Sequence, residues 1–361
     1  MKIAVVAETR DGEARVALVP ELVGKLTALG YDVAVEPGAG MHALLSDDEY
    51  VEAGATIDAD AITDADVVVS VQPLDVDRIR RLRRGTATVS FLPTTFEQAV
   101  VVDLRDCGIT AFAMELVPRI SRAQSMDALS SQALVAGYRA ALVAAERLPR
   151  FFPLFMTAAG TVAPARVLVL GAGVAGLQAI ATARRLGAVV EAYDVRPASA
   201  DEVRSMGASF IDLGLEALEG TGGYAREMAE ERAEQQRQLL TPYVGNSDAV
   251  ITTAAVPGRP APLLITTTMV EAMKPGSVLV DLAAESGGNC ELSRPGEDVE
   301  HHGVLVHGMK DAPSAMAVHA SQLYARNVVN LLLLMTTDGE VVPDFDDEIV
   351  AAACVTRKEP A

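Results

Sequence analysis

The feature that most constrains this chain is a strand, a glycine-rich turn and a helix that follow one another from residue 166. Arg166–Leu170 is apolar enough for a buried strand, and the next six residues read Gly-Ala-Gly-Val-Ala-Gly. In a dinucleotide fold Gly171 makes the tight turn, Gly173 lets the backbone approach a pyrophosphate, and Gly176 lets the helix pack against the strand. Asp194, at roughly the 20-residue distance expected after such a turn, would hold the ribose hydroxyls. The segment therefore predicts a coenzyme site.

The residue at the end of the strand 188–194 distinguishes NAD(H) from NADP(H). Asp194 places a carboxylate where the 2′-phosphate of NADP(H) would lie, and bringing two anions together there is unfavourable. Arg196 could bind a phosphate, but only if Asp194 turned away. The sequence therefore predicts NAD(H).

Composition excludes several classes of protein. The chain has 361 residues, half of them apolar, which is enough for two domains. Its net charge of −19 would repel a phosphate backbone, so we expect no nucleic-acid partner. The three cysteines lack a Cys-x-x-Cys pair and the five histidines lack a metal-binding spacing, so we expect neither disulfides nor a metal site. An early charge rules against a secretory signal, and the longest late apolar run (residues 331–335) is too short to span a membrane, so we expect no membrane-spanning segment.

The apolar pattern along the chain predicts an α/β protein with two doubly wound, Rossmann-like domains. One domain comprises residues 1–130 and 314–361, and the other, residues 131–313, carries the glycine turn. We expect mainly parallel sheets and a cofactor in the cleft between the domains. The expected strands of the first domain are 2–7, 32–36, 66–70, 87–91 and 110–113, and those of the second are 166–170, 188–194, 209–212, 248–253, 277–281 and 304–306. The expected helices include 20–29, 75–84, 95–107, 130–147 and 315–335.

Two local patterns carry further expectations. Ser199 followed by Glu202 has the spacing of a capping box, which predicts a helix that begins there. From Thr336 the chain becomes acidic, and residues 344–348 have the composition of a loose, solvated extension.

Residues 156–212 closely resemble the NAD(H)-binding subunit of proton-translocating nicotinamide nucleotide transhydrogenases, a family that shares its fold with alanine dehydrogenase. The resemblance covers nearly the whole chain, including residues 13–18 (Glu-Ala-Arg-Val-Ala-Leu) and 321–327 (Ser-Gln-Leu-Tyr-Ala-Arg-Asn). Three further segments make it specific.

The first segment is residues 118–130, which match the family loop that surrounds the nicotinamide end of NAD(H). The resemblance assigns this loop's site residues as Arg119, Ile120, Ser121, Gln124, Asp127 and Ser130. Arginines, an amide, a carboxylate and hydroxyls suit the polar lining of a carboxamide and ribose site. The residues by themselves equally suit a helix start capped by Asp127 or Ser130.

The second segment, residues 220–228, resembles the family's mobile loop, and the third, residues 251–262, follows a strand at the ligand-binding edge of the sheet. The resemblance implies that Tyr224 and Met228 close over the cofactor, although a glycine-rich surface loop has the same composition. Ala255 stands where relatives often carry a larger aliphatic residue. The remaining cofactor contacts implied are Val174, Val195, Gly223 and Gln236, beside Gly171, Gly173, Gly176, Asp194 and Arg196.

Alanine dehydrogenase is the main alternative. By resemblance, that enzyme uses an arginine, a lysine, a histidine and an aspartate, and the corresponding residues here are Arg15, Gln72, Pro93 and Glu285. A dehydrogenase of amino acids must move protons at the reacting carbon, which glutamine and proline cannot do. Transfer between two nicotinamides moves only a hydride and requires positioning and exclusion of water.

The resemblance therefore implies a transhydrogenase component that passes hydride directly between its NAD(H) and NADP(H) on a partner subunit. It also implies a homodimer, docking at the cytoplasmic face of a membrane, and a membrane-embedded proton-channel subunit. A stand-alone amino-acid dehydrogenase and a passive nicotinamide-binding module are the two alternatives.

Overall fold

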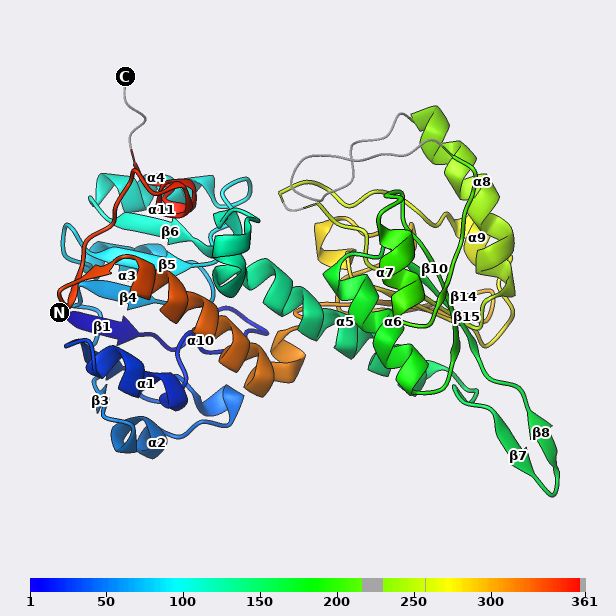
Figure 1. Ribbon diagram of the computed structural model, residues 1–361, viewed down its shortest axis with the longest axis horizontal. Helices are drawn as coiled ribbons and strands as arrows, with labels where there is room; N and C mark the ends of the chain where they lie inside the picture. The colour runs from blue at the N-terminus through cyan, green and yellow to red at the C-terminus, as the bar shows by residue number, and fades with distance from the viewer. Residues whose placement is uncertain (216–229, 257, 358–361) are drawn as a thin grey trace. The chain divides into compact units, whose positions relative to one another are not determined.

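The computed structural model describes residues 1–215, 230–256 and 258–357, and these form two compact units (Figure 1). Unit 1 comprises Met1–Gln132 and Pro313–Ala361, and unit 2 comprises Ala133–Ala312. The boundary falls within the long helix α5 (Ala128–Arg147). Among the described residues, no helix is both long and apolar enough to cross a membrane.

Unit 1 is built on a six-stranded parallel sheet in the order β3-β2-β1-β4-β5-β6. Alternate residues of most strands face two separate apolar cores: Ile3 and Val5 of β1 lie in one, and Ala4 lies in the other. Burial on both faces explains why the strands are continuous apolar runs. The strands are β1 (Lys2–Val5), β2 (Asp32–Val35), β3 (Thr56–Ile57), β4 (Val67–Val69), β5 (Ala87–Ser90) and β6 (Thr110–Ala113).

Helices cover both faces of this sheet. One face packs against α1 (Pro20–Thr27), α2 (Asp47–Glu52), α10 (Ala317–Leu334) and α11 (Glu348–Ala353). The other face packs against α3 (Val76–Arg81) and α4 (Gln98–Asp106). The sheet is therefore covered by helices from both ends of the sequence, blue to cyan and orange to red in Figure 1.

Unit 2 contains a seven-stranded sheet in the order β11-β10-β9-β12-β13-β15-β14, in which only the β14–β15 pair is antiparallel. Its strands are β9 (Arg166–Leu170), β10 (Val189–Tyr193), β11 (Ser209–Phe210), β12 (Ala249–Thr252), β13 (Val278–Asp281), β14 (Asp298–His301) and β15 (Val304–Gly308). One face packs against α5, α6 (Val174–Arg185) and α7 (Ser199–Ser205), and the other against α8 (Glu230–Asn246) and α9 (Thr267–Glu271). The predicted fold class, α/β with mainly parallel Rossmann-like sheets, is confirmed.

A hairpin that the sequence did not predict extends from unit 2 (Figure 1). It consists of β7 (Phe155–Thr157) and β8 (Gly160–Val162), and every residue of both strands is exposed. Met156 is 76% exposed and Phe155 is 42% exposed, so the hairpin presents apolar side chains to solvent.

Two local predictions were wrong: the first is the capping box at the start of α7, although the helix itself begins at Ser199 as predicted. Ala198 is the N-cap of α7 and no side chain caps this helix, because Ser199 is already helical and its side chain is buried. A capping box does occur at α2, where Ser46 and Glu49 bond reciprocally.

The second concerns the predicted loose tail, which is ordered structure as far as residue 357. Residues after α10 form a small hairpin of β16 (Thr336–Thr337) and β17 (Glu340–Val341), followed by α11. Ile349 and Val350 of α11 are fully buried in the core of unit 1. Asp347 caps the helix by accepting a hydrogen bond from Ile349 N and binds Arg122 Nη1 at 2.6 Å. The acidic composition predicted a solvated extension because the apolar residues that follow it are few. These residues anchor the segment only once the tertiary fold has formed.

Candidate functional site

The glycine turn joins β9 to α6 at the point where the strand order of unit 2 reverses, between β9 and β12. Open α/β sheets bind ligands at such a switch point, outside the carboxyl ends of the strands. Gly171 has φ of +98°, in the left-handed region that favours glycine. Gly173 is the N-cap of α6, and no side chain caps this helix. The first amides of α6 are thus available to an anion.

Gly176 allows the first turn of α6 to lie directly against the glycine turn. A Cβ added to Gly176 would be 1.9 Å from the carbonyl oxygen of Gly171. Thr253, which follows β12, holds the same turn from the other side by donating its hydroxyl to Gly171 O at 3.0 Å. The geometry of the turn therefore depends on two neighbouring strands and on the absence of a side chain at one position.

Asp194, at the end of β10, links its strand to the glycine turn. Its Oδ2 accepts a hydrogen bond from Ala172 N at 2.7 Å, and its Oδ1 accepts one from Arg196 N at 2.9 Å. The Arg196 guanidinium fills the remaining positions, with Nε at 2.8 Å from Oδ1 and Nη2 at 2.8 Å from Oδ2. A carboxylate offers about four acceptor positions, so a ribose hydroxyl must displace a contact from the Arg196 side chain.

A cavity of about 170 Å³ lies beside Asp194. Its apolar lining comes from the ends of β10 and β11 and includes Val195, Phe210 and Ile211. Arg204 and Asp212 add charged groups at its wall. Of these residues the sequence had singled out only Val195, because the others are brought to the site by pairing of β11 with β10.

Two buried polar side chains support the neighbouring loop after β12, and the sequence did not reveal them. Asn289 Oδ1 accepts from Ala254 N at 3.0 Å, and its amide nitrogen donates to Ala254 O at 2.8 Å. Asp281, at the end of β13, accepts hydrogen bonds from Asn289 N at 2.8 Å and from the Ser293 hydroxyl at 2.6 Å. Asn289 and Asp281 are both fully buried. The sequence signal that could have found this site is Asp281, a carboxylate at the end of an apolar strand.

Other predicted cofactor residues of unit 2 occupy different environments. Val174 is the first residue of α6. Gln236 of α8 is 1% exposed and accepts a hydrogen bond from the Tyr193 hydroxyl at 3.1 Å. Ala255 is exposed in the loop after β12. Gly223, Tyr224 and the rest of the predicted lid, residues 220–228, lie outside the described residues.

In unit 1, the structure brings Arg119, Asp127 and Ser130 together and leaves Gln124 exposed on the short helix η3 (Ser121–Met126). Asp127 Oδ1 accepts from Ser130 N at 2.9 Å and Oδ2 accepts from the Ser130 hydroxyl at 2.6 Å, as in a capped start of α5. Arg119 Nε lies 3.9 Å from the same carboxylate. Ile120 packs against the core. The helix-cap interpretation is therefore realised, and the polar lining of a nicotinamide site stays a prediction.

Helix α10 holds this loop in place from a distant segment of the sequence. Asn327 and Asn330 each donate a side-chain hydrogen bond to Ser125 O, at 2.9 and 3.0 Å. Asn327 Oδ1 also accepts from the Ser131 hydroxyl at 2.7 Å. The loop that carries Gln124 is thus fixed by residues far away in the chain, at separations of 202 and 205 residues from Ser125.

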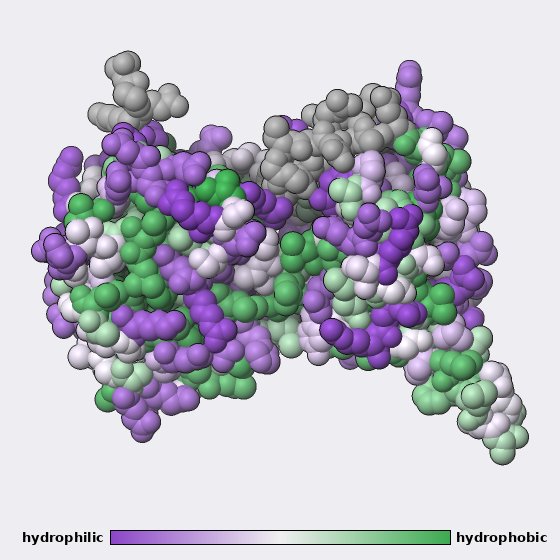
Figure 2. Space-filling view, in the orientation of Figure 1, coloured by the Kyte–Doolittle hydropathy of each residue, from purple (hydrophilic) through white to green (hydrophobic). Residues whose placement is uncertain are grey.

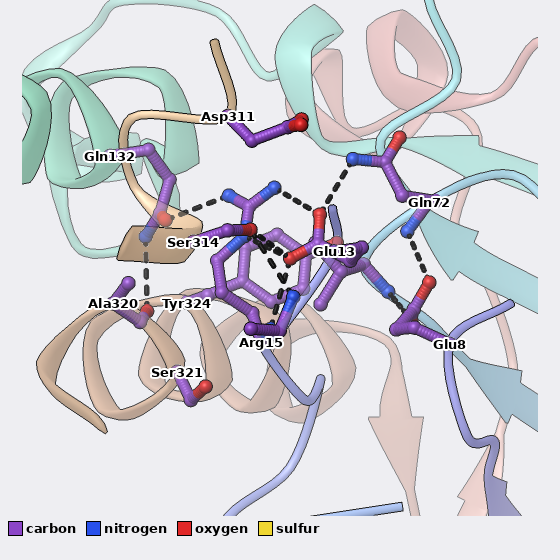
Figure 3. Close-up of polar contacts among 12 residues, drawn as sticks. Glu8, Glu13, Arg15, Gln72, Gln132, Asp311, Ser314, Ala320, Ser321 and Tyr324 are labelled. Atoms are coloured by element: carbon purple, nitrogen blue, oxygen red, sulfur yellow. Dashed lines mark hydrogen bonds and ion pairs between the residues drawn. The ribbon is translucent and has the colours of Figure 1, made fainter. Parts of the chain in front are cut away.

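A second polar cluster of unit 1 is buried around Glu13 and Arg15 (Figure 3). Glu13 and Arg15 form a paired contact, with Nη2 at 2.6 Å from Oε2 and Nε at 2.7 Å from Oε1. Gln72 donates to Glu13 Oε2 at 2.7 Å, and Arg15 Nη1 donates to Gln132 Oε1 at 2.9 Å. The donors of Arg15 and the amide of Gln72 are therefore engaged within the protein.

Two carboxyls of this cluster have opposite pKa shifts. Burial raises the pKa of Glu8 to about 7, although backbone hydrogen bonds from Val71 and Gln72 favour its charged form. Burial also opposes ionisation of Glu13, but the hydrogen bonds and positive charge of Arg15 outweigh it and lower the pKa of Glu13 to about 2. Two acidic groups close in space thus titrate in different pH ranges.

Comparison with known proteins identifies the family. The family model described as "Alanine dehydrogenase/PNT, N-terminal domain" matches residues 4–136, and "Alanine dehydrogenase/PNT, C-terminal domain" matches residues 140–360. The chain belongs to the alanine dehydrogenase/PNT family. The family predicted from the sequence is thereby confirmed.

Relatives within the alanine dehydrogenase/PNT family include both branches of it. The chain is 50% identical to an NAD(P) transhydrogenase subunit alpha chain of Rhodospirillum rubrum, over 99% of this chain and 96% of that one. It is 34% identical to alanine dehydrogenase of Mycobacterium tuberculosis, over 85% of this chain and 78% of that one. A solved transhydrogenase from Sinorhizobium meliloti superposes with a TM-score of 0.89 and 43% identity, covering 98% of each chain.

Proposed function

We propose that this chain is the NAD(H)-binding component of a proton-translocating transhydrogenase, and that it passes hydride directly between its own NAD(H) and NADP(H) on a partner subunit. The observation that carries the proposal is the uncapped α6 terminus with Asp194 at the β9–β12 switch point. The chain's similarity to a transhydrogenase alpha subunit over nearly its full length supports assigning this site to transhydrogenation.

The pyrophosphate, the adenosine ribose and the adenine of NAD(H) each have a candidate binding place in unit 2. The α6 amides and the backbone at Gly173 would bind the pyrophosphate, because they offer donors and the positive end of the helix dipole. Asp194 would accept the ribose hydroxyls once Arg196 releases it. The cavity lined by Val195 and Phe210 would take the adenine end. The nicotinamide supplies the hydride, while Arg119, Gln124, Asp127, Ser130 and Tyr224 are proposed to orient it and exclude water.

The alanine dehydrogenase alternative is disfavoured by the cluster around Arg15. Gln72 and Pro93 offer no group that can take or release a proton at neutral pH. The Arg15 guanidinium already binds Glu13 and Gln132, so an oxo acid would have to compete with two internal partners. These two substituted positions and the engaged guanidinium disfavour the chemistry of an amino-acid dehydrogenase.

The proposal includes two partner subunits. An NADP(H)-binding subunit exchanges hydride with this chain, a membrane-embedded proton-channel subunit couples the exchange to translocation, and this chain docks peripherally at the cytoplasmic face. A homodimer is also proposed, and the exposed apolar β7–β8 hairpin supports it, since solvent-exposed apolar patches favour association. Hydrophobic side chains gather at the base of this hairpin, at the lower right of Figure 2. Sedimentation of the wild type as a monomer at micromolar concentration would contradict the dimer.

One assay separates the three function classes. Purified protein should bind NADH and should transfer hydride to an NADP⁺ analogue only after a competent NADP(H)-binding subunit is added. Reduction of NAD⁺ with alanine at ordinary enzymatic rates would overturn the proposal in favour of an amino-acid dehydrogenase. Absence of transfer with a competent partner would identify a passive binding module.

Two substitutions test the assigned roles. Gln124→Asn should reduce partner-dependent transfer far more than NADH affinity, because the exposed amide is proposed to lie between the two nicotinamides. Equal losses in both measurements would contradict this position. Asp194→Ala should weaken NADH binding, and an unchanged dissociation constant would mean that another residue holds the ribose.

A further inference from the structure

A cluster of three potential metal ligands lies at the edge of unit 2, on residues that the NAD(H) site does not use. Glu271 is the last residue of α9, His301 ends β14, and His302 is in the turn between β14 and β15. His301 Nε2 is 3.0 Å and His302 Nε2 is 3.8 Å from Glu271 Oε1. Within the residues that the structure describes, this is the one group of three such side chains whose ligand atoms all lie within 4.8 Å of one another.

We propose that Glu271, His301 and His302 bind a divalent first-row transition metal ion, with Zn²⁺ as the probe. Zn²⁺ takes imidazole nitrogen and carboxylate oxygen at about 2.0–2.2 Å, which places tetrahedral ligands about 3.3 Å apart. The distances of 3.0 and 3.8 Å from the carboxylate oxygen bracket that value. Small rotations of exposed side chains suffice to close the site, and water would complete the coordination.

The conformation of His302 is a second, independent observation. His302 and Gly303 connect paired residues His301 and Val304, and both have positive φ, +51° and +72°. Two such residues form the type I′ hairpin turn, for which Asn-Gly is the preferred sequence. A histidine in the first position is held in a less favourable backbone region, and it directs its imidazole to Glu271. Metal binding would explain why this position carries histidine and not the preferred asparagine.

The charge of Glu271 is consistent with the same site. A carboxylate at the C-terminal end of a helix lies near the negative end of the helix dipole, where a cation is favoured. His301 is 30% exposed, Glu271 38% and His302 63%, so an ion can reach the three ligands from solvent. A bound ion would join α9 to the edge strand β14 and would resist fraying of that edge.

Zinc titration of the full chain tests the proposal, with the affinity tag removed. By calorimetry, the wild type should bind one Zn²⁺ with a dissociation constant in the micromolar range, and Glu271→Gln and His302→Asn should each weaken binding at least tenfold. His302→Asn should keep its melting temperature without zinc, because asparagine suits the turn, so its loss of binding will not reflect unfolding. His42→Asn, an exposed histidine of unit 1, is the matched control and should bind as the wild type does.

A second measurement, of stability with and without zinc, tests whether a bound ion joins α9 to β14. Zinc at roughly 100 times its dissociation constant should raise the folding equilibrium constant about 100-fold in the wild type and far less in His302→Asn. If the wild type shows no binding at roughly 100 μM Zn²⁺, its binding free energy is less favourable than about −5.5 kcal/mol, and the proposal is overturned. Equal binding by the wild type and both ligand variants would overturn it as well. None of these outcomes depends on NAD(H).

Discussion

Gly173→Ala should separate cofactor binding from folding at the glycine turn. In the structure Gly173 has φ of −75° and ψ of −168°, an extended conformation that alanine adopts readily. A Cβ added there would meet no atom nearer than Arg196 Nη2, at 3.9 Å. Because the new methyl group fits and alanine restricts the unfolded chain, we expect unchanged stability or a gain of about 0.4–1 kcal/mol.

The same methyl group would occupy the space through which the pyrophosphate approaches the backbone. Loss of one charge-assisted hydrogen bond is worth about 1.5–3 kcal/mol, which corresponds to a rise of roughly 10- to 150-fold in the dissociation constant of NADH. Fluorescence titration with NADH and urea unfolding of the same preparation measure the two quantities. Wild-type affinity in Gly173→Ala would refute the placement of the pyrophosphate.

Gly176→Ala is the matched contrast. Its Cβ would lie 1.9 Å from Gly171 O, so α6 must withdraw from the turn by more than an ångström. We expect a loss of about 1–3 kcal/mol or more in unfolding free energy from overpacking. Stability equal to that of Gly173→Ala would show that the close contact between α6 and the turn is not rigid.

Three further predictions follow from packing, burial and capping. Gly137→Ala should destabilise unit 2 by about 1–3 kcal/mol in urea unfolding, because the added Cβ would lie 2.0 Å from Ala175 O, whereas Gly24→Ala, with no atom within 4 Å, should be neutral or stabilising. Glu8 has its folded-state pKa raised from 4.5 to about 7, so the stability it contributes is complete below pH 4.5 and is lost as the pH rises through 7. Glu8→Gln should therefore flatten the stability curve by up to about 3 kcal/mol over that range, and parallel curves for both proteins would contradict the burial argument. Asp347→Ala should lower the unfolding free energy by about 1 kcal/mol through loss of the α11 cap, while Arg122→Ala, which removes only an exposed ion pair, should change it by less than about 0.5 kcal/mol; equal losses would assign the effect to the ion pair.

Local patterns predicted most of the fold. The apolar runs that became β1, β6 and β9 are buried on both sheet faces, so their composition alone marked them as strands. Failures occurred where a local pattern had two outcomes. Ser199 and Glu202 match a capping box and α7 does begin at Ser199, yet its N-cap is Ala198 and no side chain caps the helix. The acidic run before α11 looked solvated, yet Ile349 and Val350 anchor it in the core.

Some residues of the candidate site were likewise evident in the sequence, and others were not. Gly171, Gly176 and Asp194 were evident in the sequence because the turn that binds a pyrophosphate requires glycine at fixed spacing and an acid at the end of the next strand. Asn289 and Asn327 were not evident. Each supports a loop far away in sequence, Ala254 in one case and Ser125 in the other.

The sequence by itself determined the class of fold, the position of the glycine turn and the preference for NAD(H), because these depend on residues within about 30 positions of one another. Only the tertiary structure decided that Asn289 holds the loop of Ala254, that α10 holds the loop of Gln124, and that Glu271 meets His301 and His302. These contacts arise when strands pair and helices pack, and a periodic pattern along the chain carries no information about which side chains then meet.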